Sequence, residues 1–425
     1  MLVIAYYWPP SGGSGVQRWV KFCKYLPAEG WTPVVFAPEN ADYPSLDPTI
    51  GADLPQDLEL VRGRIWEPYA AYRKLTGAKS TEVTEISSGK KSFKQKLSLW
   101  IRANLFVPDP RVGWVRPSVK TLKNYLREHP VDVIVTTGPP HSVHLIGRKL
   151  HKALGIPWVP DFRDPWSRMY YLKYLPMTPA TWHLLRRQEQ AVLDECSTVL
   201  ACTPLVQEEF RAQTRTPVAC ITNGYDEEDF AGSAPEPDGL FNLTHTGLFA
   251  ADGNPVALWQ VLGKMAAEDP AFRQALRIRL AGKVDRDVLQ SMEDNGLKDN
   301  IIALGYCSHP RAVREQRAAS VLLLPLRNDP QYRPILPGKL FEYLAARRPI
   351  LGIGQTDGAM ARVIGEAHAG VTLDWADASA LEAFLREAWK QHCSGGVPAT
   401  AGDIGPYSRR ATAHALAQLL ETLTK

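Results

Sequence analysis

The sequence predicts an α/β protein that consists of two domains. Its 425 residues far exceed the roughly 150 residues of one typical domain. Short apolar runs alternate with helical stretches through both halves of the chain, a pattern that favours parallel sheets covered by helices. The acidic segment "DEEDFAGSAPEPDG" (226–239) separates the two series. Its proline, glycine and alanine content is typical of a linker, so we expect the domain boundary near residues 226–240.

The expected elements follow in order along the chain. In the first half, strands are predicted at 2–7, 33–37, 58–61, 133–136, 158–160 and 198–201, and helices at 16–26, 143–154 and 180–195. In the second half, strands are predicted at 241–246, 277–281, 301–304, 321–325, 350–353 and 370–373. The chain ends in an amphipathic helix for which Ser408 suits the N-cap position. The apolar stripe of this helix must be buried against one of the domains.

Composition and charge narrow the class of protein. Apolar residues make up 45% of the chain and charged residues 22%, which is typical of a folded globular protein. A net charge of +4 gives no case for nucleic acid as a partner. The chain lacks signal-peptide features and apolar runs near 18 residues, so we expect a cytoplasmic protein without a membrane span. Six cysteines at no ligand spacing predict reduced thiols and no metal site.

One local stretch is strongly basic. Between Lys90 and Lys123, lysine and arginine alternate with tryptophan, leucine and phenylalanine, and Asp109 is the one acid. Such a stretch suits an anionic membrane surface, with Trp100 and Leu105 inserted among the lipids. The alternative is an ordinary helix face in contact with water. We therefore expect either peripheral association with the inner face of a membrane or no association.

The loop after the first strand, "PPSGGSGVQR" (9–18), is rich in glycine and leads into a helix. Gly12, Gly13 and Gly15 would let backbone N–H groups face an anion at the positive end of that helix. Gly13-x-Gly15 followed by Glu39 imitates a dinucleotide fingerprint. Arg18 stands at the third glycine position, however, and the loop is too long, so a nicotinamide cofactor is disfavoured. A glycine-rich turn without a ligand is the remaining alternative.

Two further predicted strand ends carry polar side chains, at the edge where open α/β sheets bind ligands. His141 follows one strand in "VTTGPPHSVH". The next strand leads into "WVPDFRDPWS", with Asp161, Arg163 and Asp164 beside Trp166. This group could orient an acceptor hydroxyl and balance phosphate charge. A purely structural ion-pair network is the alternative.

The second half carries features that suit a phosphorylated ligand. Lys283 and Tyr306 each follow a predicted strand, where an ammonium suits a phosphate and an aromatic ring suits a base. Gly338 and Lys339 open a helix, and Glu342 lies one turn further on, where a carboxylate could bind ribose hydroxyls. A lysine in water, a core aromatic residue and an ordinary helix start are the simpler alternatives.

Taken together, these stretches resemble GT-B glycosyltransferases, in particular bacterial enzymes of the family 4 type. The resemblance implies an α/β protein of two Rossmann-like domains that face each other across a cleft. Residues 1–228 with the C-terminal helix 407–425, which crosses back, would bind the acceptor, and residues 229–406 the nucleotide-sugar donor. The stretches that carry it are "YYWPPSGGSGVQRWVKFCKYL", "TTGPPHSVHLIGRKL", "DFRDPWS", "NGYDEEDF" and "PGKLFEYLAARRPILG".

The resemblance also implies roles for individual residues. Charge stabilisation and acceptor orientation are expected from Arg163, Asp164, Lys283 and Lys339. Contacts with the acceptor are expected from Arg18, His141, Asp161 and Trp166. Contacts with the donor are expected from Gly12, Gly13, Gly15, Tyr306, Gly338, Lys339, Leu340 and Glu342.

The implied reaction moves a sugar from a UDP- or GDP-linked donor onto an acceptor hydroxyl, with retention of configuration and without a metal or other cofactor. The acceptor would be a glycan or a lipid-linked sugar in surface polysaccharide or glycolipid assembly. The chain departs from the family pattern at Pro334, where relatives carry the first of two glutamates, and at Arg163, where many carry a histidine. A frequent arginine is also missing from "THTGLFAADGNP". A nucleotide-sugar epimerase or a catalytically decayed scaffold are the alternatives.

Overall fold

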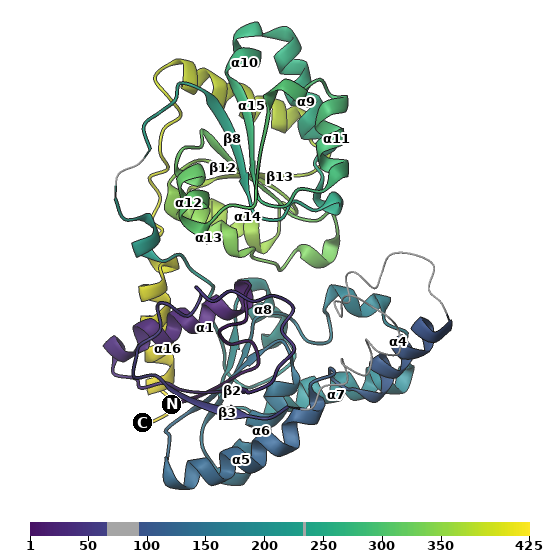
Figure 1. Cartoon of the computed structure of the whole chain (residues 1–425), viewed down its shortest axis with the longest axis vertical. Coiled ribbons are helices and arrows are strands. Elements are labelled where there is room, and N and C mark those ends of the chain that lie inside the picture. Colours follow the sequence, from purple (N-terminus) through teal and green to yellow (C-terminus); the bar gives the residue numbers. More distant parts are fainter. Residues whose placement is uncertain (66–92, 233–234) are drawn as a thin grey trace. The chain divides into compact units, whose positions relative to one another are not determined.

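The computed structural model describes residues 1–65, 93–232 and 235–425 (Figure 1). The chain forms two compact units: residues 1–222 with 412–425 (unit 1), and residues 223–411 (unit 2). The boundary after Thr222 precedes the expected linker. The reason is that Tyr225 forms a parallel bridge with Ser408, which ties the first residues after the boundary to unit 2.

Unit 1 is built on a parallel sheet, which has seven strands within the described residues, in the order β3-β2-β1-β4-β5-β6-β7. Its inner strands are buried on both faces, whereas the edge strand β3 is largely exposed. The sequence missed β7, which is only three residues long. The strands are β1 (Leu2–Ala5), β2 (Val34–Pro38), β3 (Glu59–Gly63), β4 (Ile134–Gly138), β5 (Trp158–Phe162), β6 (Val199–Ala201) and β7 (Val218–Cys220).

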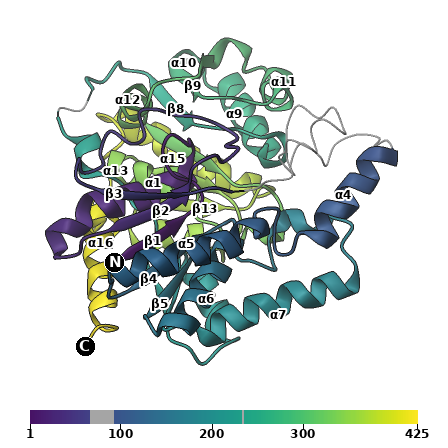
Figure 2. The same cartoon turned by 60° about the horizontal axis from the view of Figure 1, so that its bottom comes forward.

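Helices cover both faces of this sheet. Helices α5, α6 and α7 lie side by side (Figure 2) and contribute to one apolar core with α8. Helices α1 and α16 contribute to the second core, so the C-terminal helix buries its apolar stripe in unit 1, as predicted. The helices are α1 (Ser14–Tyr25), α4 (Phe93–Leu105), α5 (Val115–Glu128), α6 (Ser142–Leu154), α7 (Pro179–Glu195), α8 (Pro204–Arg211) and α16 (Arg409–Glu421).

Unit 2 repeats this plan with a parallel sheet in the order β10-β9-β8-β11-β12-β13. Its strands are β8 (Phe241–Thr246), β9 (Leu276–Ala281), β10 (Ile301–Gly305), β11 (Val321–Pro325), β12 (Ile350–Ile353) and β13 (Gly370–Leu373). Its helices are α9 (Val256–Glu268), α10 (Pro270–Ala275), α11 (Arg286–Asp294), α12 (His309–Arg317), α13 (Gly338–Ala346), α14 (Ala359–Glu366) and α15 (Ala378–Cys393).

Both sheets have the strand order of a Rossmann fold, so the predicted fold class is confirmed. In each sheet the order reverses beside the first strand of the unit, β1 or β8. Ligands of such folds bind at the carboxyl ends of the strands near this reversal. The site residues should therefore be sought in the segments that follow β1, β4 and β5 in unit 1, and β8, β9, β10 and β11 in unit 2.

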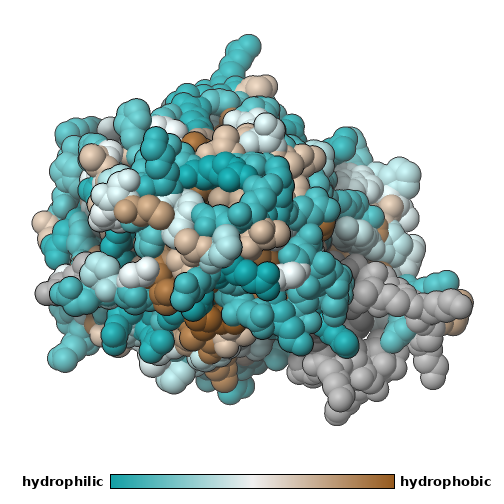
Figure 3. Space-filling view, turned by 90° about the horizontal axis from the view of Figure 1, so that it is seen from above, coloured by the Kyte–Doolittle hydropathy of each residue, from teal (hydrophilic) through white to brown (hydrophobic). Residues whose placement is uncertain are grey.

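The surface is mostly hydrophilic on the face drawn in Figure 3, where apolar residues appear in small groups. Within residues 1–65, 93–232 and 235–425, none of the helices has the length and apolar composition that a bilayer span requires.

Candidate functional site

The glycine-rich loop of unit 1 contains three glycines with different surroundings. Gly13 has a φ of 97° and no atom within 4 Å of the place where a Cβ would lie. The Gly12 N–H donates to the carbonyl oxygen of Ser45 (2.9 Å). A Cβ on Gly15, in contrast, would collide with the guanidinium of Arg163. Of the three, therefore, only Gly13 combines a left-handed backbone with open space.

Arg163 uses its guanidinium to hold two loops of unit 1. Its Nε and Nη2 donate to the carbonyl oxygens of Gly138 (3.1 Å) and Pro139 (2.5 Å), and Nη1 donates to the carbonyl oxygen of Gly15. Burial lowers the pKa of Arg163, while Asp164 opposes that shift. The side chain therefore links the start of α1 to the loop after β4, and its first role in this structure is positioning.

Arg18 and Asp161 form a buried ion pair in unit 1. Asp161 accepts hydrogen bonds from Arg18 Nη2 (3.0 Å), Trp19 Nε1 (2.7 Å) and Thr137 Oγ1 (2.9 Å). Arg18 also donates to the carbonyl oxygen of Ile221 (2.8 Å). Their side chains are only 1% and 0% exposed. The assignment of both residues to the acceptor is therefore corrected: their polar atoms are occupied inside the protein, where they connect α1, β4, β5 and the chain after β7.

His141 and His144 lie at the start of α6 and are both buried. Burial and the charge of Arg163 lower both pKa values, that of His144 to about 3, so both imidazoles are neutral at physiological pH. The His144 Nδ1 pairs with Thr136 Oγ1 (2.8 Å). Within the described part of the chain, neither ring nitrogen of His141 has a hydrogen-bond partner. The His141 ring stacks on Trp166 at a centroid distance of 5.0 Å, which brings these two predicted residues together.

Asp164 follows β5, close to the residues described above, and its carboxylate is available to a ligand. Burial raises its pKa, and the charge of Arg163 opposes that shift. Among the described residues, its carboxylate accepts no hydrogen bond from a side chain or a backbone amide. A carboxylate in such surroundings can accept a hydrogen bond from a ligand hydroxyl.

In unit 2, Lys339 lies against the loop that follows β8. Its Nζ lies 3.3 Å from the carbonyl oxygen of Leu248 and 3.3 Å from the Nε2 of His245. Burial lowers the pKa of Lys339 to about 8, and Glu342 opposes that shift. The lysine therefore stays mainly protonated at pH 7, and its ammonium lies between the start of α13, to which it belongs, and the loop after β8.

His245 is a member of this half-site that the sequence analysis missed. Its Nδ1 lies 3.0 Å from the carbonyl oxygen of Leu323. Because a carbonyl only accepts, we assign the proton to Nδ1, and Nε2 then accepts from Lys339. The longer contact of Nε2 with the Leu248 carbonyl (3.3 Å) does not change this assignment. The signal in the sequence is a histidine between two threonines at the end of the predicted strand 241–246.

Glu342 lies against helix α12, which contributes two side-chain contacts to its carboxylate. Its Oε2 accepts from Gln316 Nε2 (2.7 Å), and its Oε1 lies 4.0 Å from the Nδ1 of His309. Gln316 also donates to Thr246 Oγ1 (3.1 Å). One carboxylate oxygen is thus fixed by α12, and the other faces the exposed His309 at the start of that helix. Neither Gln316 nor His309 was singled out from the sequence.

The remaining predicted donor residues divide into accessible and buried ones. Lys283 is exposed, and its backbone lies beside the β8 loop, because its carbonyl accepts from the Phe249 N–H (2.9 Å). Tyr306 is 96% exposed, and exposed Gly338 begins α13. Leu340 is corrected: its side chain is fully buried and its N–H already donates to the carbonyl of Pro337 (3.0 Å).

Comparison with solved structures shows a fold shared with glycosyltransferases over the whole chain. A glycosyltransferase from Rickettsia africae aligns with a TM-score of 0.61 at 12% identity, covering 100% of this chain and 98% of that one. The lipopolysaccharide outer core galactosyltransferase WaaB aligns with a TM-score of 0.61 at 11% identity and 99% of each chain. Anabaena HepE, solved in complex with UDP-glucose, aligns with 0.56 at 13% identity, covering 100% and 97%. The fold is therefore that of GT-B glycosyltransferases.

The family is shown by the sequence itself. The model of Glycosyltransferase Family 4 matches residues 13–229, just over half of the 425 residues. The chain belongs to this family and is a glycosyltransferase, which confirms the resemblance inferred from its motifs. None of the curated proteins compared matches the sequence.

Proposed function

We propose that this glycosyltransferase moves a sugar from a UDP- or GDP-linked donor onto the hydroxyl of a glycan or lipid-linked acceptor, with retention of configuration. The pathway would be the assembly of a surface polysaccharide or glycolipid. The observation that carries the proposal is Lys339, which reaches from the start of α13 to the β8 loop in unit 2. A partly buried cation at a helix start beside the β8 loop suits the diphosphate of such a donor.

Neighbouring residues supply the other contacts that a nucleotide needs. Lys283 would bind a second phosphate oxygen, and the amides at the start of α13 would add partial positive charge. Glu342, whose Oε2 is fixed by Gln316, would accept hydrogen bonds from ribose hydroxyls. The exposed ring of Tyr306 would stack on the base. These contacts would hold the donor through its nucleotide and leave the sugar free to react.

Transfer would proceed without a covalent enzyme intermediate. The leaving phosphate would assist deprotonation of the acceptor hydroxyl on the same face of the sugar, while Lys283 and Lys339 stabilise the charge that develops on it. Asp164 would orient the acceptor, and Arg163 would position the loops around it. Because two cations and a helix start can perform the task of a divalent ion, we propose that the reaction is metal-independent.

Two proteins of similar fold support this proposal. HepE was solved in complex with UDP-glucose, and WaaB is a galactosyltransferase of the lipopolysaccharide outer core. Both share the fold of this chain at low identity.

The proposal is tested by a thermal-shift screen of UDP-, GDP-, ADP- and dTDP-sugars in the presence of EDTA, followed by assays of nucleotide release. We expect one nucleotide class to raise the melting temperature and release to require an acceptor. Epimerised sugar formed without an acceptor would identify an epimerase. No shift with any nucleotide would indicate a scaffold and overturn the proposal.

We further propose that the protein associates peripherally with a membrane through α4. This helix belongs to the basic stretch 90–123 and exposes several apolar side chains. Residues 90–92 of that stretch lie outside the described residues. Phe93, Leu97 and Leu105 of α4 are 80%, 50% and 65% exposed, whereas α5 buries Leu122 and Leu126. Flotation with vesicles that contain anionic lipid should recover the protein at low salt and lose it in the variant Leu97→Ser/Leu105→Ser. Equal recovery of both proteins would contradict a role for α4.

A further inference from the structure

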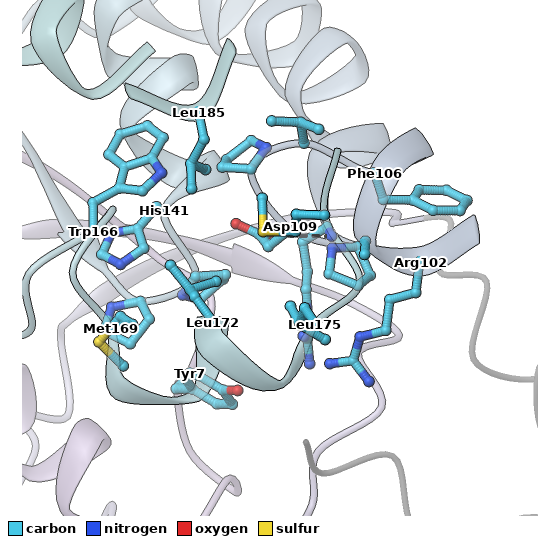
Figure 4. A pocket seen from close by; sticks show the side chains of 18 of the residues that line it. Tyr7, Arg102, Phe106, Asp109, His141, Trp166, Met169, Leu172, Leu175 and Leu185 are labelled. Atoms are coloured by element: carbon cyan, nitrogen blue, oxygen red, sulfur yellow. Dashed lines mark hydrogen bonds between the residues drawn. The ribbon is translucent and has the colours of Figure 1, made fainter. Parts of the chain in front are cut away.

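Unit 1 contains a cavity of about 270 Å³ that borders the acceptor half-site (Figure 4). Its floor includes the predicted acceptor residues His141 and Trp166, which follow β4 and β5. Its walls come from the end of α4 with the following segment 106–111, from Leu185 of α7, and from Met169, Leu172, Leu175 and Met177. The cavity thus extends from the carboxyl edge of the sheet toward α4.

The walls of this cavity are mainly apolar. Phe106, Met169, Leu172, Leu175 and Leu185 contribute side chains to it, and Figure 4 shows them arranged around the opening. Lining a cavity with aliphatic and aromatic groups favours an apolar occupant, because each buried CH₂ contributes about 0.8 kcal/mol. A sugar or a nucleotide alone would not use this wall.

The charged residues at the cavity do not select a charged occupant. Two of them, Arg102 and Arg111, are basic, and two, Asp42 and Asp109, are acidic. The Asp109 carboxylate is already used by the N–H (2.8 Å) and hydroxyl (3.0 Å) of Ser142. The formal charges balance, which suits a neutral ligand head.

His141 supplies the polar recognition at the floor. It is 4% exposed, and within residues 1–65, 93–232 and 235–425 both of its ring nitrogens lack partners. A neutral imidazole offers one donor and one acceptor, which matches a hydroxyl group that can accept and donate. A single sugar hydroxyl could pair with either of the two nitrogens.

We propose that this cavity binds the hydrocarbon chain of a glycolipid acceptor, with the hydroxyl-bearing sugar at His141. The inference rests on the proposed transferase function and names the class of its acceptor. The exposed apolar side chains of α4 continue from the cavity wall formed by Arg102 and Ala103. A chain in the cavity would therefore lead from the strand ends toward the helix that we propose to contact lipid.

The test measures binding of n-decyl β-D-glucopyranoside to the full chain, below its micelle concentration, beside methyl β-D-glucopyranoside. The two probes share the sugar head and differ in the chain. We expect the decyl probe to bind at least about tenfold more tightly, since partial burial of its chain already exceeds the 1.4 kcal/mol that a tenfold change requires. Equal affinity of the two probes would overturn the proposal.

Two variants locate the binding site. Leu175→Gln places a polar side chain in the cavity wall, and Leu154→Gln makes the same change at a partly exposed position at the end of α6. Leu175→Gln should weaken binding of the decyl probe at least fivefold, and Leu154→Gln should leave it unchanged. Identical effects of the two variants would contradict the site. Ala103→Phe fills the cavity from another wall and should also weaken binding of the decyl probe. It replaces Leu175→Gln in the test if that variant does not fold.

Failure of the glycolipid proposal can be distinguished from failure of the proposed transferase function. Nucleotide-dependent thermal shifts depend on unit 2 and should persist in Leu175→Gln. Nucleotide binding and acceptor-dependent release without any advantage of the decyl probe would overturn the glycolipid proposal alone. Binding of the decyl probe without any nucleotide effect would overturn the proposed reaction.

Discussion

The two units share one sheet topology but use their strand ends in different ways. In unit 1 three of the charged residues near the strand ends, Arg18, Asp161 and Arg163, are bound to the protein itself. In unit 2 the corresponding edge presents Lys283 and Tyr306 to solvent and holds Lys339 at the start of a helix. Unit 1 places an apolar cavity and neutral histidines at this edge, whereas unit 2 places cations there.

This difference shows why residue type alone does not identify a ligand site. An arginine that donates to three carbonyl groups stabilises loops, while a lysine at a helix start remains available to a phosphate. The account therefore predicts that charge removal in unit 1 affects mainly stability and that charge removal in unit 2 affects mainly transfer.

The largest effect is expected from breaking the buried ion pair of unit 1. Arg18→Ala leaves the Asp161 carboxylate buried without its cation and should lower the free energy of unfolding by about 3 to 5 kcal/mol. Arg64→Ala, which removes an ion pair to Glu39 between exposed side chains, should cost less than about 1 kcal/mol. Urea unfolding followed by tryptophan fluorescence measures both. Similar losses in the two variants would contradict the structural role of Arg18.

The next effect concerns acid sensitivity of unit 1. Because the folded pKa of His144 lies at about 3 and the unfolded value near 6.5, the unfolded chain binds the proton first as pH falls. Stability is therefore lost between about pH 6.5 and pH 3, and His144 alone should account for about 2 kcal/mol at pH 5. His144→Gln should reduce the loss between pH 7 and pH 5 by that amount. Replacement of the exposed His183 by glutamine should not, and calorimetry at both pH values distinguishes the two.

A smaller free-energy change is expected in unit 2, where it concerns the activation free energy of transfer and is measured as a lower transfer rate. Lys339→Ala removes the cation beside the β8 loop and should slow transfer at least tenfold, or about 1.4 kcal/mol. Glu342→Ala should have a similar effect through the ribose. Lys298→Ala, an exposed lysine of the same unit, serves as the control and should retain the wild-type rate. Near wild-type rates in both site variants would remove the support for this donor site.

The smallest effect is expected in the dependence of the transfer rate on pH, on its alkaline side. Since the pKa of Lys339 is lowered to about 8, its charge is present below that pH and is lost as pH rises through it. The wild-type transfer rate should therefore fall above about pH 8. Lys339→Arg keeps its charge at these pH values and should flatten the limb, even where its absolute rate is lower. An unchanged limb in this variant would assign the titration to another group.

The fold could be predicted because buried parallel strands leave a strong local pattern. Continuous apolar runs such as Leu2–Ala5 and Val321–Pro325 identified the strands of both sheets. The boundary between the units was less visible, since it depends on the pairing of Tyr225 with Ser408, which are distant in sequence. Strand β7 was missed because three residues are too few to show the apolar run that identifies a buried strand.

The site could be predicted only in part, for a related reason. Sequence placed Lys339 and His141 at helix starts that follow strands, on the edge of the sheet where such folds bind ligands. It could not show that Asp161 faces Arg18 rather than solvent, because that contact joins residues 143 positions apart. Nor could it identify His245, whose role depends on Lys339 from another element, or the cavity, whose walls come from several segments.

The most direct test of the account is transfer of a labelled sugar from the nucleotide donor selected by the thermal-shift screen to n-decyl β-D-glucopyranoside, with the anomeric configuration of the product read by NMR. The account predicts acceptor-dependent formation of a product with retained configuration in the presence of EDTA, and a rate at least tenfold lower in Lys339→Ala. Release of nucleotide that is independent of acceptor, or a product with inverted configuration, would contradict it.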